Sequence, residues 1–387
     1  MGIDTGAAGH IPDSHTEERP KRITMVARDN MLTLDLAQRN PELWDLFTGK
    51  EEYSPEVVDR FGRIQSNAGG NQNLIEPLVS RYLIERECKF EYPDGRPFAI
   101  CLTHDIDHLY QPLLEKGLAT AVAIRDRNFR KALQMILQFH NKRHPWCNLR
   151  AITEIEEHYG ARSSFFIQAL DPDDQDYTYD VSDLESELGE IADESWEIGL
   201  HGGYMASTGL EGLVNDKQRL ERILGKPVVG YRAHSLRFKV PDTWELLAEA
   251  GFRYDTTYGY ADHVGFRNGM CHPFQPFNLN TGQFVDIMEL PLVFMDRTCL
   301  TYMQLDARAT YDLAVRLIDA VAACHGVLTL LWHNTTMDGA LLGVYEKILQ
   351  YCSDSGAWMT SGDEISSWWQ KLGAGPSSQE KPLIPGN

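Results

Sequence analysis

Short β-rich runs alternate with helical stretches from Phe98 onward, and this alternation constrains the fold more than any other feature of the sequence. Such a pattern is typical of βα repeats built on a parallel sheet. Seven runs favour a closed or nearly closed α/β barrel. They lie at 98–105, 162–169, 197–203, 228–234, 252–257, 285–293 and 326–334, and an eighth short element at 357–369 could complete the series.

The rest of the chain is less regular. Residues 1–22 and 373–387 lack a periodic apolar pattern, so we expect disorder at both ends. Residues 23–95 mix short helical signals, at 40–49 and 73–88, with turns rich in Gly and Asn. We therefore expect a small α/β accessory region at 23–95, followed by the barrel at 96–372.

Charge and composition exclude several classes of function. The 387 residues include 56 acidic and 36 basic side chains, which gives a formal net charge of −20. Such a chain repels phosphate backbones, so we expect no nucleic-acid partner. The seven cysteines are dispersed and form no CxxC pair, which predicts thiols in a reducing compartment. With neither a secretory signal nor a run long enough to span a bilayer, the sequence predicts a cytoplasmic protein without a transmembrane segment.

Polar side chains gather where the predicted strands end. Barrel enzymes take their catalytic residues from the carboxyl ends of several strands, so this distribution predicts one active site. Side chains at i and i+2 of a strand share a face, which places Asp105 beside Asp107. Two carboxylates so close repel each other unless a divalent metal and an arginine compensate, and one of them then remains as a base. The strand-end residues are Asp105, Asp107, Gln168, His201, Arg232, His234, Asp255 and His333.

The motifs at these strand ends resemble those of a known family. LTHDID, EIGLHGGY, GYRAHSLRF, AGFRYDTTYGY and LLWHN follow the motif order of the polysaccharide deacetylase superfamily, also called the NodB homology domain or carbohydrate esterase family 4. The first motif, LTHDID, is similar to the first motif of a subgroup of this family, which reads THDxD. The resemblance spans residues 98–370 and implies a distorted (β/α) barrel. It also implies a metal-dependent hydrolase that removes an N-acetyl or other acyl group from an amino sugar or polysaccharide intermediate.

The resemblance assigns a metal centre. Asp107 corresponds to the metal-binding Asp of the first motif, and His201 to the first metal-binding His of the second. Met205 stands where the family has its second His, which is a departure from the pattern. We expect His234, on the same strand face as Arg232, to supply the missing ligand. The expected cofactor is Zn²⁺, with Co²⁺ or Mn²⁺ as alternatives.

The resemblance also assigns catalytic roles. Asp105 corresponds to the general base, and Arg232 to the arginine that pairs with this base and tunes it. Asp255 corresponds to the Asp that orients the catalytic histidine, and His333 to that histidine, the general acid. The implied reaction is attack on the acyl carbonyl by water that the metal activates, after which His333 protonates the departing amine.

Two other functions stay open at the level of sequence. The histidine missing at Met205 leaves room for a metal-independent C–N hydrolase of the same fold. The other alternative is a catalytically inactive carbohydrate-binding homologue. The individual residues also admit structural explanations, with His201 and His333 as core histidines and Arg232 as the ion-pair partner of Asp255.

Overall fold

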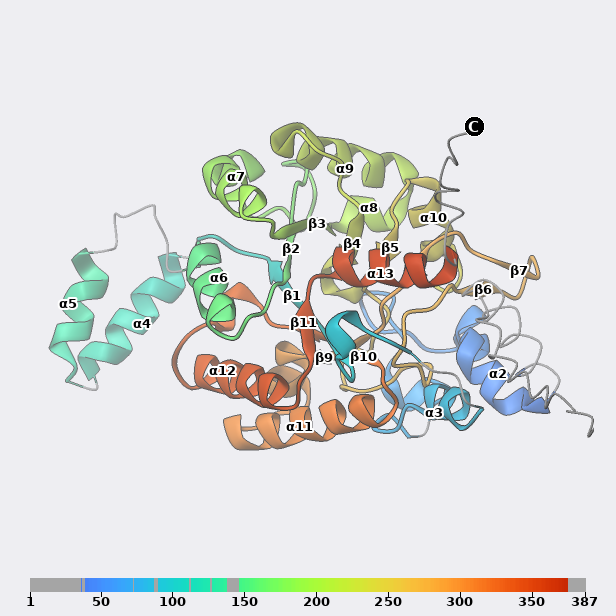
Figure 1. Cartoon of the computed structure of the whole chain (residues 1–387). Coiled ribbons are helices and arrows are strands. Elements are labelled where there is room, and N and C mark those ends of the chain that lie inside the picture. The colour runs from blue at the N-terminus through green and yellow to red at the C-terminus, as the bar shows by residue number, and fades with distance from the viewer. Residues whose placement is uncertain are drawn as a thin grey trace, which may run out of the picture.

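Eight parallel strands surround the centre of the computed structural model, and helices lie outside them (Figure 1). The structure describes residues 36, 39–71, 73–86, 90–110, 113–125, 127–137 and 146–374. The strands follow the order β8 (Met288–Glu289), β5 (Tyr254–Asp255), β4 (Gly230–Ala233), β3 (Glu197–Gly202), β2 (Ser164–Ile167), β1 (Ala99–Ile106), β10 (Val327–Leu331) and β9 (Leu292–Met295). Since β8 and β9 stand at opposite ends of this order, the barrel is open between them. The expected distorted (β/α) barrel is confirmed.

The number of strands differs from the prediction for a local reason. The run 285–293, predicted as one strand, contains β8 and the start of β9, with Pro291 between them. Proline has no backbone N–H to donate to a ladder, so a strand is interrupted at this residue. The eighth predicted element holds β11 (Trp358–Thr360), which pairs with the first half of β1 rather than closing the barrel.

Strand β1 forms the centre of the sheet and is buried along its whole length. Parallel strands with helices on their outer face are covered on both sides, which explains the apolar start of this strand. Ile100 and Leu102 belong to the same apolar cluster as Leu317 and Ile348, which lie on two of the outer helices. This packing holds the polar end of β1 in a fixed position.

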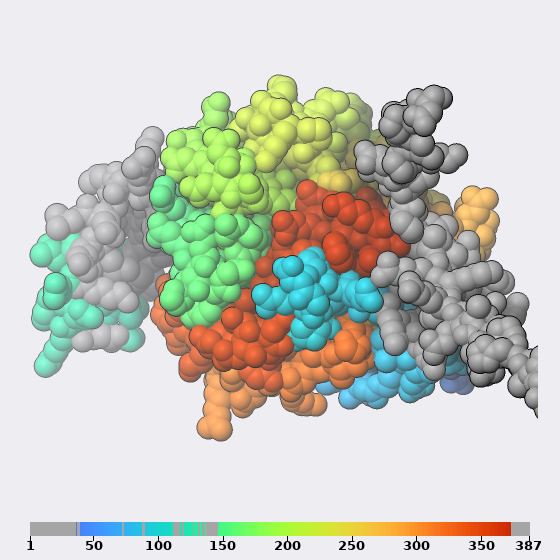
Figure 2. All heavy atoms as spheres, viewed as in Figure 1, coloured from blue at the N-terminus to red at the C-terminus, as the bar shows by residue number. Residues whose placement is uncertain are grey.

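Helices fill the connections between strands. In the space-filling view of Figure 2, atoms of the C-terminal part of the chain, in red, occupy the middle of the visible face. No helix in the described ranges combines the length and apolar character needed to cross a bilayer. The helices of the barrel region are α4 (Leu113–Arg125), α5 (Phe129–Leu137), α6 (Leu149–His158), α7 (Glu185–Asp193), α8 (Tyr204–Thr208), α9 (Leu210–Leu224), α10 (Asp242–Glu249), α11 (Ala307–Ala323), α12 (Gly339–Asp354) and α13 (Gly362–Ala374).

A short antiparallel hairpin lies in the connection between β5 and β8. Its strands are β6 (Phe277–Asn278) and β7 (Gln283–Phe284). This hairpin packs near the N-terminal region, because Tyr53 donates a hydrogen bond to the carbonyl of Phe277. The connection between β5 and β8 therefore belongs to the surface that receives the N-terminal residues.

The N-terminal region packs directly on the barrel. Its helices are α2 (Pro41–Thr48) and α3 (Leu78–Glu85), and α2 begins with Asn40 as its cap and ends at Gly49, whose φ is 62°. Glu52 forms a buried ion pair with Arg267 at 2.6 Å. We expected an α/β region here, but its described residues form helices and turns without a strand. The predicted disorder of 1–22 and of most of 373–387 concerns residues outside those the structure describes.

Candidate metal centre and active site

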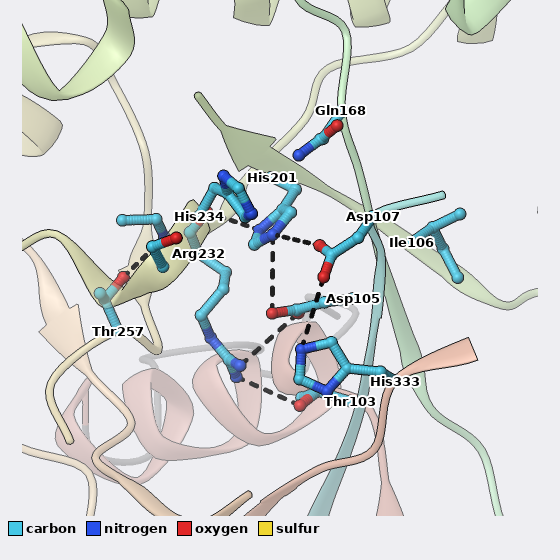
Figure 3. Close-up of polar contacts among 12 residues, drawn as sticks. Thr103, Asp105, Ile106, Asp107, Gln168, His201, Arg232, His234, Thr257 and His333 are labelled. Carbon is cyan, nitrogen blue, oxygen red and sulfur yellow. Dashed lines mark hydrogen bonds and ion pairs between the residues drawn. The ribbon is translucent and has the colours of Figure 1, made fainter. Parts of the chain in front are cut away.

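Side chains from the carboxyl ends of four strands converge on one point (Figure 3). Asp105 is the last residue but one of β1, and Asp107 directly follows this strand. His201 on β3 lies in register with Arg232 on β4, and His333 follows β10 by two residues. These segments come from distant parts of the sequence, and the parallel barrel brings their ends together.

Asp107, His201 and His234 can hold a metal ion. Their ligand atoms all lie within 4.8 Å of one another, and His201 Nε2 is 3.1 Å from Asp107 Oδ1. His201 Nδ1 lies 3.1 Å from the carbonyl oxygen of Arg232, which leaves Nε2 for the metal. One carboxylate and two imidazoles match the ligands of catalytic zinc sites, in which a fourth position stays open to water or substrate. The donor set therefore fits the expected cofactor.

A second group of residues orients His234. His234 Nδ1 lies 3.0 Å from Asp176 Oδ2, and both terminal nitrogens of Arg237 donate to the same carboxylate. Burial lowers the pKa of His234, but Asp176 and Asp107 outweigh this effect and raise it. Partners of this kind fix the ring of a metal-binding histidine.

The charges around Asp107 favour its ionised form. Burial alone raises the pKa of this carboxyl group. The hydrogen bond from His201, together with the nearby His333 and His234, outweighs burial and holds the pKa of Asp107 well below its usual range. An ionised carboxylate is the form that binds a metal.

Asp105 lies beside this centre and faces a buried arginine. Arg232 Nη1 is 3.6 Å from Asp105 Oδ1, and His201 Nε2 is 3.7 Å from Asp105 Oδ2. Arg232 has no exposed surface, and Thr103 and Thr256 accept hydrogen bonds from its guanidinium group. Within the described residues, Asp105 Oδ1 has no hydrogen-bond donor. The carboxylate thus lies between the arginine, which faces Oδ1, and the metal group, which lies on the side of Oδ2.

His333 faces the centre from the side of β10. Its Nδ1 lies 2.6 Å from Asp296 Oδ1, its backbone N–H donates to Asp296 Oδ2 at 2.9 Å, and its Nε2 is 3.6 Å from Asp107 Oδ2. Burial opposes the charged ring, but Asp296, Asp107 and Asp105 outweigh burial and raise the pKa of His333 to about 9. His333 is therefore a cation at neutral pH, held by one carboxylate and directed toward another.

Comparisons with known proteins give the fold. Neither a protein-family model nor a curated protein matches the sequence. A solved structure from Mycobacterium smegmatis, described as a polysaccharide deacetylase, is similar with a TM-score of 0.51 and 19% identity over 76% of this chain and 98% of that one. Another from Pseudomonas aeruginosa PAO1, described in the same way, has a TM-score of 0.50 and 13% identity over 72% of this chain and 93% of that one. The chain has the polysaccharide deacetylase fold.

One further match is more distant. A CE4 family pseudoenzyme from Bacillus anthracis covers 74% of this chain and 80% of its own, with 10% identity and a TM-score of 0.37. A similarity this low carries no argument about activity. The function of this chain therefore depends on the residues that it places on the polysaccharide deacetylase fold.

Asp255 does not take the place that the motif resemblance gave it in the polysaccharide deacetylase fold. It accepts a hydrogen bond from Thr257 at 2.6 Å and lies in register with Glu289 on β8. Burial and the neighbouring Asp255 raise the pKa of Glu289 well above its usual range. The carboxylate that contacts His333 is that of Asp296. This corrects the expectation that Asp255 orients His333.

Sequence reasoning missed Asp296, although a usable signal existed. Asp296 directly follows β9, as Asp107 directly follows β1. The rule that found the other residues at strand ends also applies to Asp296. The prediction ended this strand at residue 293, which hid the position of the carboxylate.

Met205 stands apart from the metal centre. It lies in α8 with 37% of its surface exposed, and its backbone N–H donates to Asp174 Oδ2 at 2.7 Å. His234 occupies the third corner of the metal group instead. The departure from the motif at Met205 is therefore compatible with a set of three ligands.

His104 points away from the site, as its neighbour Asp105 points into it. Its Nδ1 lies 2.7 Å from the carbonyl of Trp332, and its Nε2 lies 2.8 Å from Glu156. Trp332 directly precedes His333, so the contact between His104 and Trp332 links the ends of β1 and β10 on the side away from the site.

Gln168, also noted at a strand end, is buried at the end of β2 and accepts a hydrogen bond from Thr178 at 3.3 Å.

Proposed function

We propose that this chain is a metal-dependent hydrolase that removes an N-acetyl or other acyl group from an amino sugar or a polysaccharide intermediate. The observation that carries the proposal is the convergence of Asp107, His201 and His234 within 4.8 Å of one another. Asp105 and His333 lie beside this group. A metal site with a carboxylate base and an imidazole acid beside it suits amide hydrolysis.

The three ligands hold the ion in this proposal. Zn²⁺ suits two imidazoles and a carboxylate, with Co²⁺ or Mn²⁺ as alternatives. When bound, such an ion acidifies water and polarises a carbonyl oxygen. Asp176 and the carbonyl of Arg232 fix the rings of His234 and His201 through their second nitrogens.

Asp105 is the general base. It removes the proton of the water that attacks the acyl carbon. Arg232 supplies a buried positive charge 3.6 Å from the carboxylate and keeps it directed at the centre. We assign Arg232 a positioning role, because its other hydrogen bonds go to Thr103 and Thr256.

His333 is the general acid. Asp296 holds its Nδ1–H, so Nε2 is the nitrogen that faces the substrate. A pKa of about 9 keeps His333 protonated at neutral pH, ready to donate to the departing amine. Asp105 and His333 thus divide the two proton transfers that amide hydrolysis needs.

The substrate class and the compartment are also part of the proposal. The two solved structures of the same fold are described as polysaccharide deacetylases, which supports a carbohydrate substrate. The described cysteines are free. Dispersed free thiols support a cytoplasmic location.

Metal analysis combined with an activity assay tests this function. Purified protein is expected to contain a divalent ion, and to release acetate from N-acetylated sugars. A chelator should abolish the release, and Zn²⁺, Co²⁺ or Mn²⁺ should restore it. Asp105→Asn is expected to keep the metal but to lose about 100-fold or more in kcat. Absence of any bound divalent ion, with an activity that chelators do not change, would refute metal dependence.

A further inference from the structure

A cavity opens beside the metal centre and extends toward the N-terminal region. Its volume is 660 Å³, within the usual range of ligand sites. Asp176 lines this cavity, and its Oδ2 lies 3.0 Å from His234 Nδ1. The cavity therefore borders the side chain that contacts the metal ligand His234, so the cavity and the surroundings of the metal centre share one side chain. The lining includes Arg60, Phe61, Asp176, Tyr204, Arg237 and Lys239.

The lining of this cavity is basic in a strongly acidic chain. Three of its four charged residues are Arg60, Arg237 and Lys239, although acidic side chains outnumber basic ones 56 to 36 in the whole sequence. The single acid, Asp176, is already paired with Arg237 and His234. The cavity therefore has an excess of positive charge, which comes from Arg60 and Lys239.

The two remaining cations are accessible to a ligand. Arg60 is exposed, and its guanidinium lies 4.6 Å from the centre of the Phe61 ring. Among the described residues, no ion pair engages Arg60. Lys239 pairs with Asp242 at 2.6 Å, but both side chains are more than half exposed. An exposed pair of this kind contributes little energy, so an anionic ligand can compete for the lysine.

Aromatic and backbone contacts hold this wall in place. Arg63 donates to the carbonyl of Ser235, next to His234, and its guanidinium lies 4.6 Å from the centre of the Phe61 ring. The segment 60–63 of the N-terminal region is therefore fastened to the segment that carries the ligand His234. Tyr204, which is 43% exposed, offers an aromatic face in the same cavity. Such a face suits a sugar ring.

We infer that this cavity binds a negatively charged group of the substrate, so that the substrate is an acylated amino sugar carrying a carboxylate or a phosphate. The inference rests on the proposed deacetylase function and specifies its substrate. Arg60 and Lys239 bind the anionic group by charge-assisted hydrogen bonds, and Tyr204 contacts the sugar ring. The N-terminal region then serves as one wall of the substrate site.

Three probes that differ only in their charged group test the inference. They are N-acetylglucosamine, N-acetylglucosaminuronic acid and N-acetylglucosamine 1-phosphate. Binding to the metal-loaded protein is measured by calorimetry or by NMR titration. We expect at least one anionic probe to bind about tenfold more tightly than the neutral sugar. This preference should weaken as salt is added. The stronger of the two anionic probes identifies carboxylate or phosphate as the group.

Two variants distinguish the cavity from direct binding at the metal. Arg60→Gln is expected to remove most of the preference for the anionic probe. Arg308→Gln is the matched control, because Arg308 lies on α11 with 90% of its side chain exposed and outside the cavity lining. It removes the same charge and should leave the preference unchanged. Lys239→Gln gives a second, independent measurement in the cavity.

The outcomes separate this inference from the proposed function. Equal binding of all three probes would overturn the inference, as would a preference that survives in both Arg60→Gln and Lys239→Gln. Release of acetate from the probes is measured in parallel. If the Arg60-dependent preference is present but no acetate is released from any probe, the anionic subsite stands and the deacetylase proposal fails.

Discussion

Asp107 and His201 lie 94 positions apart in the sequence, yet Asp107 Oδ1 and His201 Nε2 are separated by only 3.1 Å. The pairing of β1 with β2, and of β2 with β3, brings their strand ends together. His234 completes a group of three ligands because it follows β4, the next strand of the sheet. The site is thus a direct consequence of the strand order.

The third ligand is the first point to test. His234→Ala is expected to weaken metal binding by at least about tenfold, because a removed ligand costs no less than a removed supporting group. Met205→Ala should leave metal affinity unchanged, because Met205 is partly exposed and outside the ligand group. Metal titration followed by calorimetry measures both variants. A loss of affinity in Met205→Ala without one in His234→Ala would contradict this assignment.

Asp296 is expected to control the acid His333. In Asp296→Asn the largest positive influence on the pKa of His333 is gone, so this pKa should fall from about 9 toward its ordinary value. The active form of a general acid is protonated, so activity is lost as pH rises through this pKa. The alkaline limb of the pH–kcat profile should therefore move to lower pH, with kcat about 100-fold lower.

Asp255→Asn is the control for this prediction. Asp255 accepts a hydrogen bond from Thr257 and lies in register with Glu289, whereas His333 contacts Asp296 and Asp107. Replacement of Asp255 should leave the alkaline limb where it is. If the alkaline limb shifted in Asp255→Asn but not in Asp296→Asn, Asp255 would be the residue that orients His333, as the motif resemblance implies.

The sequence predicts the barrel and most of the site because both depend on local patterns. Alternation of runs predicts parallel strands, and the i, i+2 rule places Asp105 beside Asp107. Asp296 was missed because the predicted strand ended at residue 293, whereas β9 extends to Met295. The role of Asp255 was assigned from the motif resemblance, whereas the pairing of β9 with β10 brings Asp296 to His333.

The cavity beside the metal could not be predicted from the sequence. Arg63 and Ser235 are 172 positions apart, and their hydrogen bond depends on how the N-terminal region packs on the barrel. No periodicity in 23–95 indicates which loop faces the site. Contacts of this kind follow from tertiary packing, where side chains far apart in sequence fill the same volume.

Buried His272 makes stability depend on pH. Burial lowers its pKa to about 3 and outweighs the hydrogen bonds to the carbonyls of Cys324 and His325, which raise it. As pH falls, the imidazole of His272 binds a proton near pH 6.5 in the unfolded chain but only at lower pH in the folded chain. Its contribution to stability is therefore complete above pH 6.5 and is lost as pH falls toward 3. At pH 5 the expected loss is about 2 kcal/mol.

Urea unfolding at pH 7 and pH 5 measures this effect. His272→Gln has no titrating ring, so the free energy of unfolding should fall less between these two pH values in the variant than in the original protein. Other groups also titrate in this range, and the comparison with the variant isolates His272. An identical pH dependence in both proteins would show that the pKa of His272 is the same in the folded and unfolded chains, which would contradict this prediction.

The buried pair of Glu52 and Arg267 is expected to hold the N-terminal region on the barrel. Both side chains are at most 4% exposed, and Arg267 donates to both carboxylate oxygens. Glu52→Leu leaves a buried guanidinium without its partner, which should lower the free energy of unfolding by about 3–5 kcal/mol. In the double variant with Arg267→Met, much of this loss should be recovered, because no unpaired charge remains. Urea unfolding of the single and double variants measures the coupling, and purely additive losses would mean that the pair contributes through packing rather than through charge.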